Sequence, residues 1–127
     1  MPTNASRRSA RVAERVRAEL MELLIRGAVR DPGASGVWVS GVTISNDLKH
    51  ARVFIRLTEV DAGQPAREAA VKALTRACGY LRKELAPRLR LKYMPELSFF
   101  WDEHVDRASR VEELLIEIGR EGKAHAE

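Results

Sequence analysis

The sequence has few of the residues that build covalent bridges, metal sites or nucleotide sites. It holds one cysteine and three histidines in 127 residues, which excludes an internal disulfide and leaves metal ligands too sparse for a zinc site. The glycines Gly36 and Gly41 have the spacing of a phosphate-binding loop, but Val42 follows where that loop requires lysine. We therefore expect no metal, no cofactor, no catalytic residue and no enzymatic activity.

Long apolar stretches are also absent. No run approaches the roughly 18 consecutive apolar residues that suggest a membrane span, and the N-terminus lacks the apolar core of a secretory signal. The single cysteine, Cys78, falls on a helical apolar seam, as expected for a small core residue in a reducing compartment. These features predict a soluble, cytoplasmic protein without a membrane partner, and the length predicts one domain.

Positive charge is plentiful and unevenly distributed. Residues 1–30 and residues 61–100 each carry a net charge of +4, residues 31–60 are neutral, and residues 101–127 carry −4. Seventeen of the 22 basic residues are arginines, whose planar fork suits phosphate, although genomic base composition can give the same bias. Two basic blocks before an acidic tail make nucleic acid the first candidate partner.

Residues 66–85 predict a helix with two unlike faces. Its apolar residues recur every three or four positions and form one seam: Val71, Leu74, Cys78, Leu81 and Leu85. A basic row interrupted by one glycine lies nearly opposite: Lys72, Arg76, Gly79 and Lys83. Glycine costs about 1 kcal/mol against alanine in a helix, so Gly79 either bends the helix or admits a polyanion backbone. Pro87 is expected to end or kink this helix.

A first helix is predicted from Ser6, as its N-cap, to about Arg26, with Gly27 as its stop. Its apolar face is Val12, Val16, Leu20, Leu23 and Leu24. Arginines line the flank beside that face: Arg8, Arg11, Arg15 and Arg26, with Arg7 further round. Positive charge near a helix start opposes the macrodipole. The flank is therefore either a merely solvated surface or a binding surface that justifies the cost.

Three strands are predicted, over residues 37–45, 51–58 and 97–101. Gly41 separates two phases of alternation and marks a bulge, and the turn at 46–50 makes the first two strands a hairpin. The outward set Arg52, Phe54 and Arg56 either grips nucleic acid or covers an exposed sheet face. A helical crossover makes the third strand parallel to the second. A C-terminal helix around residues 111–118, with Ser109 and Glu112 as a capping box, completes the expected elements.

This order of elements predicts an α+β fold: helix, strand, strand, kinked helix and strand, with the helices on one face of a three-stranded mixed sheet. It resembles a type II KH domain, an RNA-binding module. The Gly-x-x-Gly spacing at residues 33–36 precedes a strand, whereas Ala77-Cys78-Gly79 stands where KH domains carry their loop between two helices. Residues 41–55 and 94–102 are similar to the strand-turn-strand and third-strand signatures of the ribosome-binding factor A family.

The resemblance covers residues 6–118, which we take as a KH-like RNA-binding domain, with a flexible N-terminus at 1–5 and a flexible acidic tail at 119–127. It implies a non-enzymatic factor that binds the immature 30S small ribosomal subunit, contacts 16S rRNA, and supports late maturation and processing, including at low temperature. It also implies release by an assembly GTPase. We expect a monomer.

Candidate RNA-binding residues follow from the basic rows, the hairpin turn and the resemblance. They are Arg7, Arg8, Arg11, Arg15, Asp47, Lys49, Arg52, Lys72, Arg76, Ala77, Gly79, Arg82, Lys83, Arg88, Arg90 and Lys92. Cations and a small-residue break suit contact with a phosphate backbone. The alternative from another class is a basic adaptor domain that binds acidic protein partners without RNA.

Overall fold

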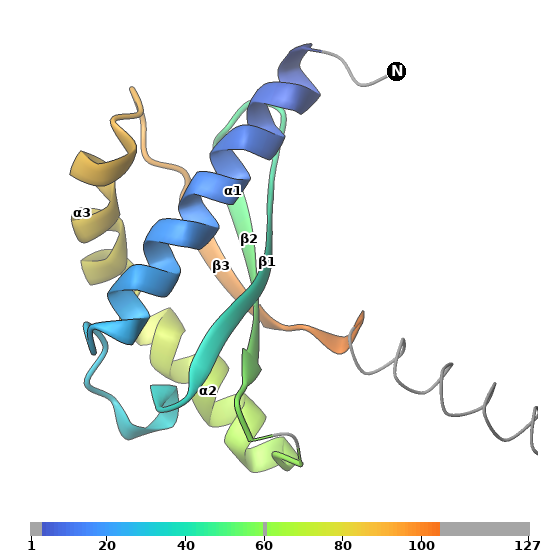
Figure 1. Cartoon of the computed structure of the whole chain (residues 1–127), viewed down its shortest axis with the longest axis vertical. Coiled ribbons are helices and arrows are strands. Elements are labelled where there is room, and N and C mark those ends of the chain that lie inside the picture. The colour runs from blue at the N-terminus through green and yellow to red at the C-terminus, as the bar shows by residue number, and fades with distance from the viewer. Residues whose placement is uncertain (1–3, 60, 105–127) are drawn as a thin grey trace, which may run out of the picture.

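The computed structural model describes residues 4–59 and 61–104, which form a sheet with helices packed against it (Figure 1). The elements are α1 (Asn4–Ile25), the 3-10 turn η1 (Pro32–Ala34), β1 (Val37–Ile44), β2 (His50–Leu57), α2 (Gln64–Arg76), α3 (Cys78–Leu89) and β3 (Glu96–Trp101). The predicted α+β class is confirmed. The predicted C-terminal helix and its capping box lie outside the described residues, and the domain limits at 6 and 118 stay a prediction.

The sheet has the order β1-β2-β3, with β1 antiparallel to β2 and β2 parallel to β3. The predicted hairpin and the parallel crossover strand are both confirmed. The ladder between β1 and β2 shifts register between Val39 and Gly41, which leaves Ser40 as the extra residue of a bulge. The predicted break in alternation is therefore a bulge at the expected place.

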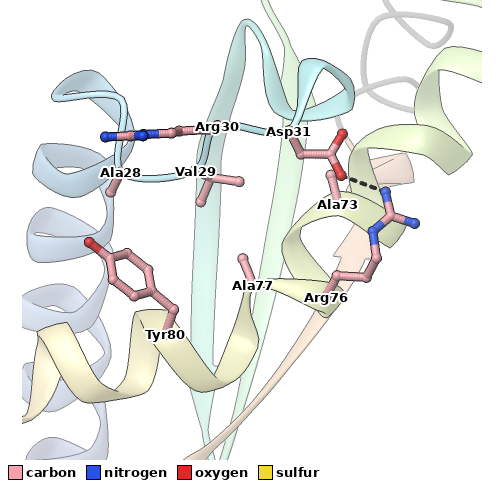
Figure 2. Close-up of a pocket in the computed structure, with 8 residues that line it drawn as sticks. All are labelled: Ala28, Val29, Arg30, Asp31, Ala73, Arg76, Ala77 and Tyr80. Atoms are coloured by element: carbon pink, nitrogen blue, oxygen red, sulfur yellow. Dashed lines mark hydrogen bonds and ion pairs between the residues drawn. The ribbon is translucent and has the colours of Figure 1, made fainter.

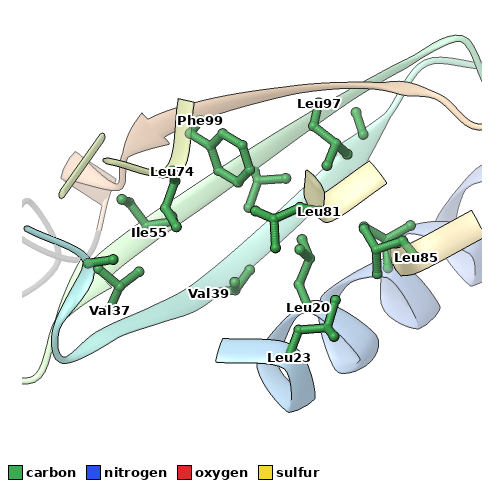
Figure 3. Close-up of a cluster of buried hydrophobic side chains, with 14 of the residues drawn as sticks. Leu20, Leu23, Val37, Val39, Ile55, Leu74, Leu81, Leu85, Leu97 and Phe99 are labelled. Carbon is green, nitrogen blue, oxygen red and sulfur yellow. The ribbon is translucent and has the colours of Figure 1, made fainter. Parts of the chain in front are cut away.

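The core lies between the inner face of the sheet and all three helices (Figure 3). Leu20 of α1, Leu74 of α2 and Leu81 of α3 are fully buried there, against Val53 and Ile55 of the central strand. Burial of a leucine contributes about 1.5–3 kcal/mol. The alternation of β2 and the helical seams thus converge on one apolar layer.

The start of α1 differs from the prediction and its end agrees with it. The helix begins at Asn4, so Ser6 lies inside it and is not the N-cap. Gly27 has a φ of +77° and follows the last turn, where its amide donates to Leu24 and the Ala28 amide donates to Leu23. This left-handed ending is the one that glycine favours.

The predicted kink is confirmed, but it divides residues 64–89 into two helices that run in different directions (Figure 1). The division falls at Ala77, whose φ and ψ are −84° and 0°, and not at Gly79, which lies in the first turn of α3. It lets α2 pack on β3 while α3 packs on α1. The prediction of one basic row along a single helix is therefore wrong. Lys72 and Arg76 belong to α2, whereas Gly79 and Lys83 belong to α3.

Of the two alternatives predicted for Pro87, that it ends or kinks its helix, the first is wrong. The helix α3 continues through Pro87 to Leu89, and Arg90 then turns left-handed with a φ of 52°. Proline removes one helical hydrogen bond, the one to the carbonyl of Lys83, and Pro87 stands two residues before the last residue of α3. The buried side chains of Leu85 and Leu89 hold the last turn against the core.

Candidate nucleic-acid interface

Most of the predicted RNA-binding side chains reach solvent. The exposed ones are Arg7, Arg8, Arg11, Arg15, Asp47, Lys49, Arg52, Lys72, Arg76, Gly79, Lys83, Arg90 and Lys92, whereas Ala77, Arg82 and Arg88 are half-buried. Whether any of them contacts RNA stays a prediction. The structure does decide which of them lie together and which already have partners within the protein.

A first group lines a cavity of about 510 Å³, here called the tip pocket. Its walls come from three segments: Arg8 of α1, the β1–β2 turn with Asp47, Leu48 and Lys49, and the α3–β3 loop with Leu91, Lys92 and Tyr93. Four of the predicted residues, from three segments that are remote in sequence, thus meet at one place. Three cations surround one carboxylate there, which favours an anionic ligand.

Asp47 fixes the shape of the turn that carries Lys49. Its Oδ1 accepts hydrogen bonds from Ser45 Oγ, at 2.6 Å, and from the Lys49 amide, at 3.0 Å. The Ser45 hydroxyl and then the Lys49 amide hold the pKa of Asp47 below its usual range. The Lys49 carbonyl accepts from the Glu96 amide at 2.8 Å, so the turn is fastened to β3.

A second group lines a cavity of about 530 Å³ at the α2–α3 junction, here called the hinge pocket (Figure 2). Its walls are Ala28, Val29, Arg30, Asp31, Ala73, Arg76, Ala77 and Tyr80. Figure 2 shows Arg76 reaching toward Asp31 on one side, with Arg30 and Tyr80 on the other. The pocket therefore presents two arginines and one exposed ring beside the predicted residue Ala77.

Asp31 joins the loop before β1 to the end of α2. Its Oδ2 pairs with Arg76 Nη2, and its Oδ1 accepts from the Gly33 amide at 2.9 Å. The Arg76 guanidinium, followed by the Gly33 amide, lowers the pKa of Asp31. Arg76 therefore carries one internal ion pair, although its side chain is still 65% exposed.

Gly79 is an exposed residue of α3 with ordinary helical backbone. A Cβ built on it would meet nothing within 4 Å. The absence of a side chain is therefore not required by packing or by a left-handed φ. The interpretation that the residue admits an external backbone stays a prediction, and the reading that it bends the helix does not apply because the bend is at Ala77.

Three of the predicted arginines hold the fold together. Arg82 donates to the carbonyl oxygens of Met94 and Pro95, at 3.0 and 3.2 Å. Arg88 pairs with Glu19 and Glu22 of α1, and Arg15 donates to the Leu89 carbonyl at 2.9 Å. Glu19 is the first cause of the raised pKa of Arg88. These partners lie far away in sequence, so no local pattern announces them.

The outward side chains of β2 were expected either to grip nucleic acid or to cover an exposed sheet face, and they differ in which of these they fit. Arg52 is exposed, whereas Arg56 is buried, donates to the Asp102 carbonyl at 3.1 Å and lies 4.6 Å from the Trp101 ring centroid. Arg56 therefore covers the sheet. Phe54 packs near Phe100, with ring centroids 6.0 Å apart.

Two residues that the sequence reasoning missed are Tyr80 and Tyr93. They are the only tyrosines of the chain, they are 50% and 76% exposed, and each lines one of the two basic pockets. Tyr93 directly follows the basic run Arg88, Arg90 and Lys92. An aromatic side chain beside clustered cations is the signal that could have marked it.

Other ligand classes find little support in the described part of the chain. Between residues 4 and 104, leaving out residue 60, no three His, Cys, Asp or Glu side chains come close enough to hold a metal ion. Among the same residues, no helix combines the length and apolar character needed to cross a membrane.

Known proteins with similar sequences were found over nearly the whole chain. Residues 8–115 match the family described as ribosome-binding factor A. The ribosome-binding factor A of Xanthomonas euvesicatoria is 44% identical over 119 residues, which cover 93% of this chain and 87% of that protein. The protein of the same name from Gloeobacter violaceus is 36% identical over 122 residues, 94% and 92% of the two chains.

Solved structures agree with the sequence matches. The crystal structure of ribosome-binding factor A from Thermus thermophilus has a TM-score of 0.60 and 27% identity, covering 73% of this chain and 94% of that one. A Thermus thermophilus homology model fitted into a cryo-EM map of a complex with the 30S subunit has a TM-score of 0.52 and 27% identity, covering 70% and 93%. The chain therefore belongs to the ribosome-binding factor A family.

Proposed function

We propose that this protein binds the immature 30S small ribosomal subunit by gripping 16S rRNA phosphates, and so supports late maturation. The observation that carries the proposal is the tip pocket, where Arg8, Lys49 and Lys92 converge from three segments. Such convergence suits a phosphate backbone, because each cation contacts a phosphate without reading sequence. The model of a related protein was fitted into a cryo-EM map of its complex with 30S, which supports the small subunit as the partner proposed here.

The activity is binding and not catalysis, in keeping with a family of ribosome-binding factors. A factor that binds one conformation of the maturing subunit more tightly than the others shifts the population toward it. The remaining parts of the proposal rest on the family alone: a cytoplasmic monomer, a role at low temperature, and release by an assembly GTPase.

The test is co-sedimentation with purified free small subunits and, separately, with full ribosomes. The protein should sediment with the free subunits and not with full ribosomes. Lys49→Gln/Lys92→Gln should weaken the association, whereas the matched control Arg17→Gln/Arg26→Gln should not. The control removes two positive charges whose ion-pair partners, Glu14 and Glu22, lie nearby in sequence.

Two results would contradict the proposal. Equal sedimentation with both particles would favour the adaptor alternative, because an adaptor for acidic proteins has no reason to discriminate between them. Equal weakening by the two double variants would show that net charge, and not the tip pocket, drives the association.

A further inference from the structure

Tyr93 stands out by what surrounds it and not by exposure alone. Single exposed apolar side chains are ordinary on protein surfaces. Tyr93, however, is 76% exposed on the wall of a cavity that also presents Arg8, Lys49 and Lys92. Leu48 and Leu91 line the same cavity and pack against the core from their partly buried positions. The tip pocket thus combines a flat ring, an apolar base and three cations.

This combination is the one that recognises a nucleotide. Bases stack on aromatic rings whatever their identity, because every base has a π-face, and cations take the phosphates beside them. A cavity of about 510 Å³ lies in the range of small-ligand sites. We propose that the tip pocket binds one unpaired RNA nucleotide, with its base stacked on Tyr93 and its phosphate held by the surrounding cations. The inference rests on the proposed function and names the nucleotide state that this site selects.

The ring requires an unpaired nucleotide. In an A-form helix each base is covered by its neighbours and the major groove is too narrow for side chains to read, so an aromatic ring can stack only on a base that has left the helix. The cations alone would accept duplex and single strand alike. Tyr93 is therefore the residue that separates the two.

Internal hydrogen bonds hold the walls of the pocket in place. Arg82 fastens the loop that carries Tyr93 by donating to the carbonyl oxygens of Met94 and Pro95. On the opposite wall, Asp47 fixes the turn that carries Lys49. A site held in shape before binding loses less entropy when its ligand arrives. Arg82 and Asp47 are positioning residues of this pocket.

The charges within the pocket orient the nucleotide. The Lys92 Nζ lies 5.6 Å from the centroid of the Tyr93 ring, so stacking on the opposite face of the ring leaves that ammonium available to a phosphate. Asp47 is ionised at neutral pH, as an ordinary aspartate is, and the Ser45 hydroxyl lowers its pKa further. Its negative charge repels a phosphate, so the phosphate lies against Arg8, Lys49 and Lys92 and not against the Asp47 carboxylate.

The direct test uses a single-stranded heptaribonucleotide with one 2-aminopurine, and the same strand annealed to its complement. Fluorescence of 2-aminopurine falls when the base stacks on an aromatic ring. The full-length protein should quench the single strand and leave the duplex unchanged. Tyr93→Phe should retain the binding, and Tyr93→Ala and Tyr93→Leu should each weaken it at least about fivefold, as expected for one lost base stack. Ile25→Ala, at a residue that is 77% exposed at the far end of α1, is the matched control.

The variants separate stacking from apolar contact. Full retention by Tyr93→Leu with loss by Tyr93→Ala would mean that Tyr93 serves an apolar contact, as with a protein partner, and would overturn the proposal. Equal binding of single strand and duplex would overturn it as well. Circular dichroism of each variant should match that of the unmodified protein, because the exposed ring is not part of the core.

A measurement of binding to small subunits distinguishes failure of the nucleotide-pocket inference from failure of the proposed function. If the unmodified protein and all Tyr93 variants bind small subunits alike, the proposed function stands and the nucleotide pocket is refuted. If the unmodified protein does not bind small subunits, the proposed function fails, and the heptaribonucleotide alone decides whether the pocket takes an unpaired base.

Discussion

Arg15 of α1 donates from Nη2 to the carbonyl oxygen of Leu89, at 2.9 Å, in the last turn of α3. Carbonyls at a helix C-terminus have no partner within the helix, and a nearby cation also complements the helix dipole. The relationship gives Arg15 a task in the fold that its place on an arginine-rich flank does not reveal. Its neighbour Arg11 is exposed on the same helix.

Arg15→Gln is therefore expected to destabilise the protein, because the shorter neutral side chain loses a charged hydrogen bond between α1 and α3. The free energy of unfolding should fall by about 1–2 kcal/mol, measured by urea denaturation. Arg11→Gln, the matched control, should change it by less than about 0.5 kcal/mol. Equal stability of the two variants would show that the Arg15 bond contributes nothing.

Gly79→Ala should raise the free energy of unfolding by about 1 kcal/mol, because Gly79 is helical and a Cβ there meets open space. Binding to small subunits should be nearly unchanged. Gly79→Glu should weaken that binding by placing a carboxylate one helical turn from Lys83, while the far-UV circular dichroism stays the same. Normal binding by a folded Gly79→Glu variant would remove this position from the interface.

The ion pair between Asp31 and Arg76 predicts acid sensitivity at the α2–α3 junction. The pKa of Asp31 is lower in the folded protein than in the unfolded chain. The pair therefore contributes its full stability above the ordinary aspartate pKa of about 4 and loses it as pH falls through the lowered folded pKa. Thermal unfolding of Asp31→Asn should begin below that of the unmodified protein at pH 7, and the difference should shrink as the pH falls below the ordinary aspartate pKa of about 4. A constant difference across this range would contradict the assignment.

Patterns that repeat within one element predicted the fold well. The alternation of Ala51, Val53 and Ile55 corresponds to fully buried side chains of the central strand. Gly27 ends α1 where expected, because a left-handed φ favours glycine whatever the tertiary context. Such signals depend only on residues close together in the sequence, so they can be recognised without knowing the tertiary structure.

Features that depend on contacts between residues far apart in sequence could not be predicted from patterns within one element. Alanine is the best helix former, so residue propensity does not mark Ala77 as the break, which only the resemblance to KH domains placed at Ala77-Cys78-Gly79. The break lets α2 pack on β3 while α3 packs on α1. Arg82 and Arg88 looked like free cations until their partners in the Met94–Pro95 loop and on α1 became visible. Folding adds Arg8 and Lys49, which are remote in sequence, to the cations that directly precede Tyr93 in the chain.

The salt dependence of small-subunit binding tests the central claim, that tip-pocket cations grip rRNA phosphates, most directly. The logarithm of the affinity should fall linearly with the logarithm of salt concentration, by about 0.7–0.9 per phosphate contact. Lys49→Gln/Lys92→Gln should make that slope shallower by about 1.4–1.8 for the two lost contacts, and Arg17→Gln/Arg26→Gln should leave it unchanged. A flat dependence for the unmodified protein, or an identical slope for the tip-pocket variant, would contradict the account.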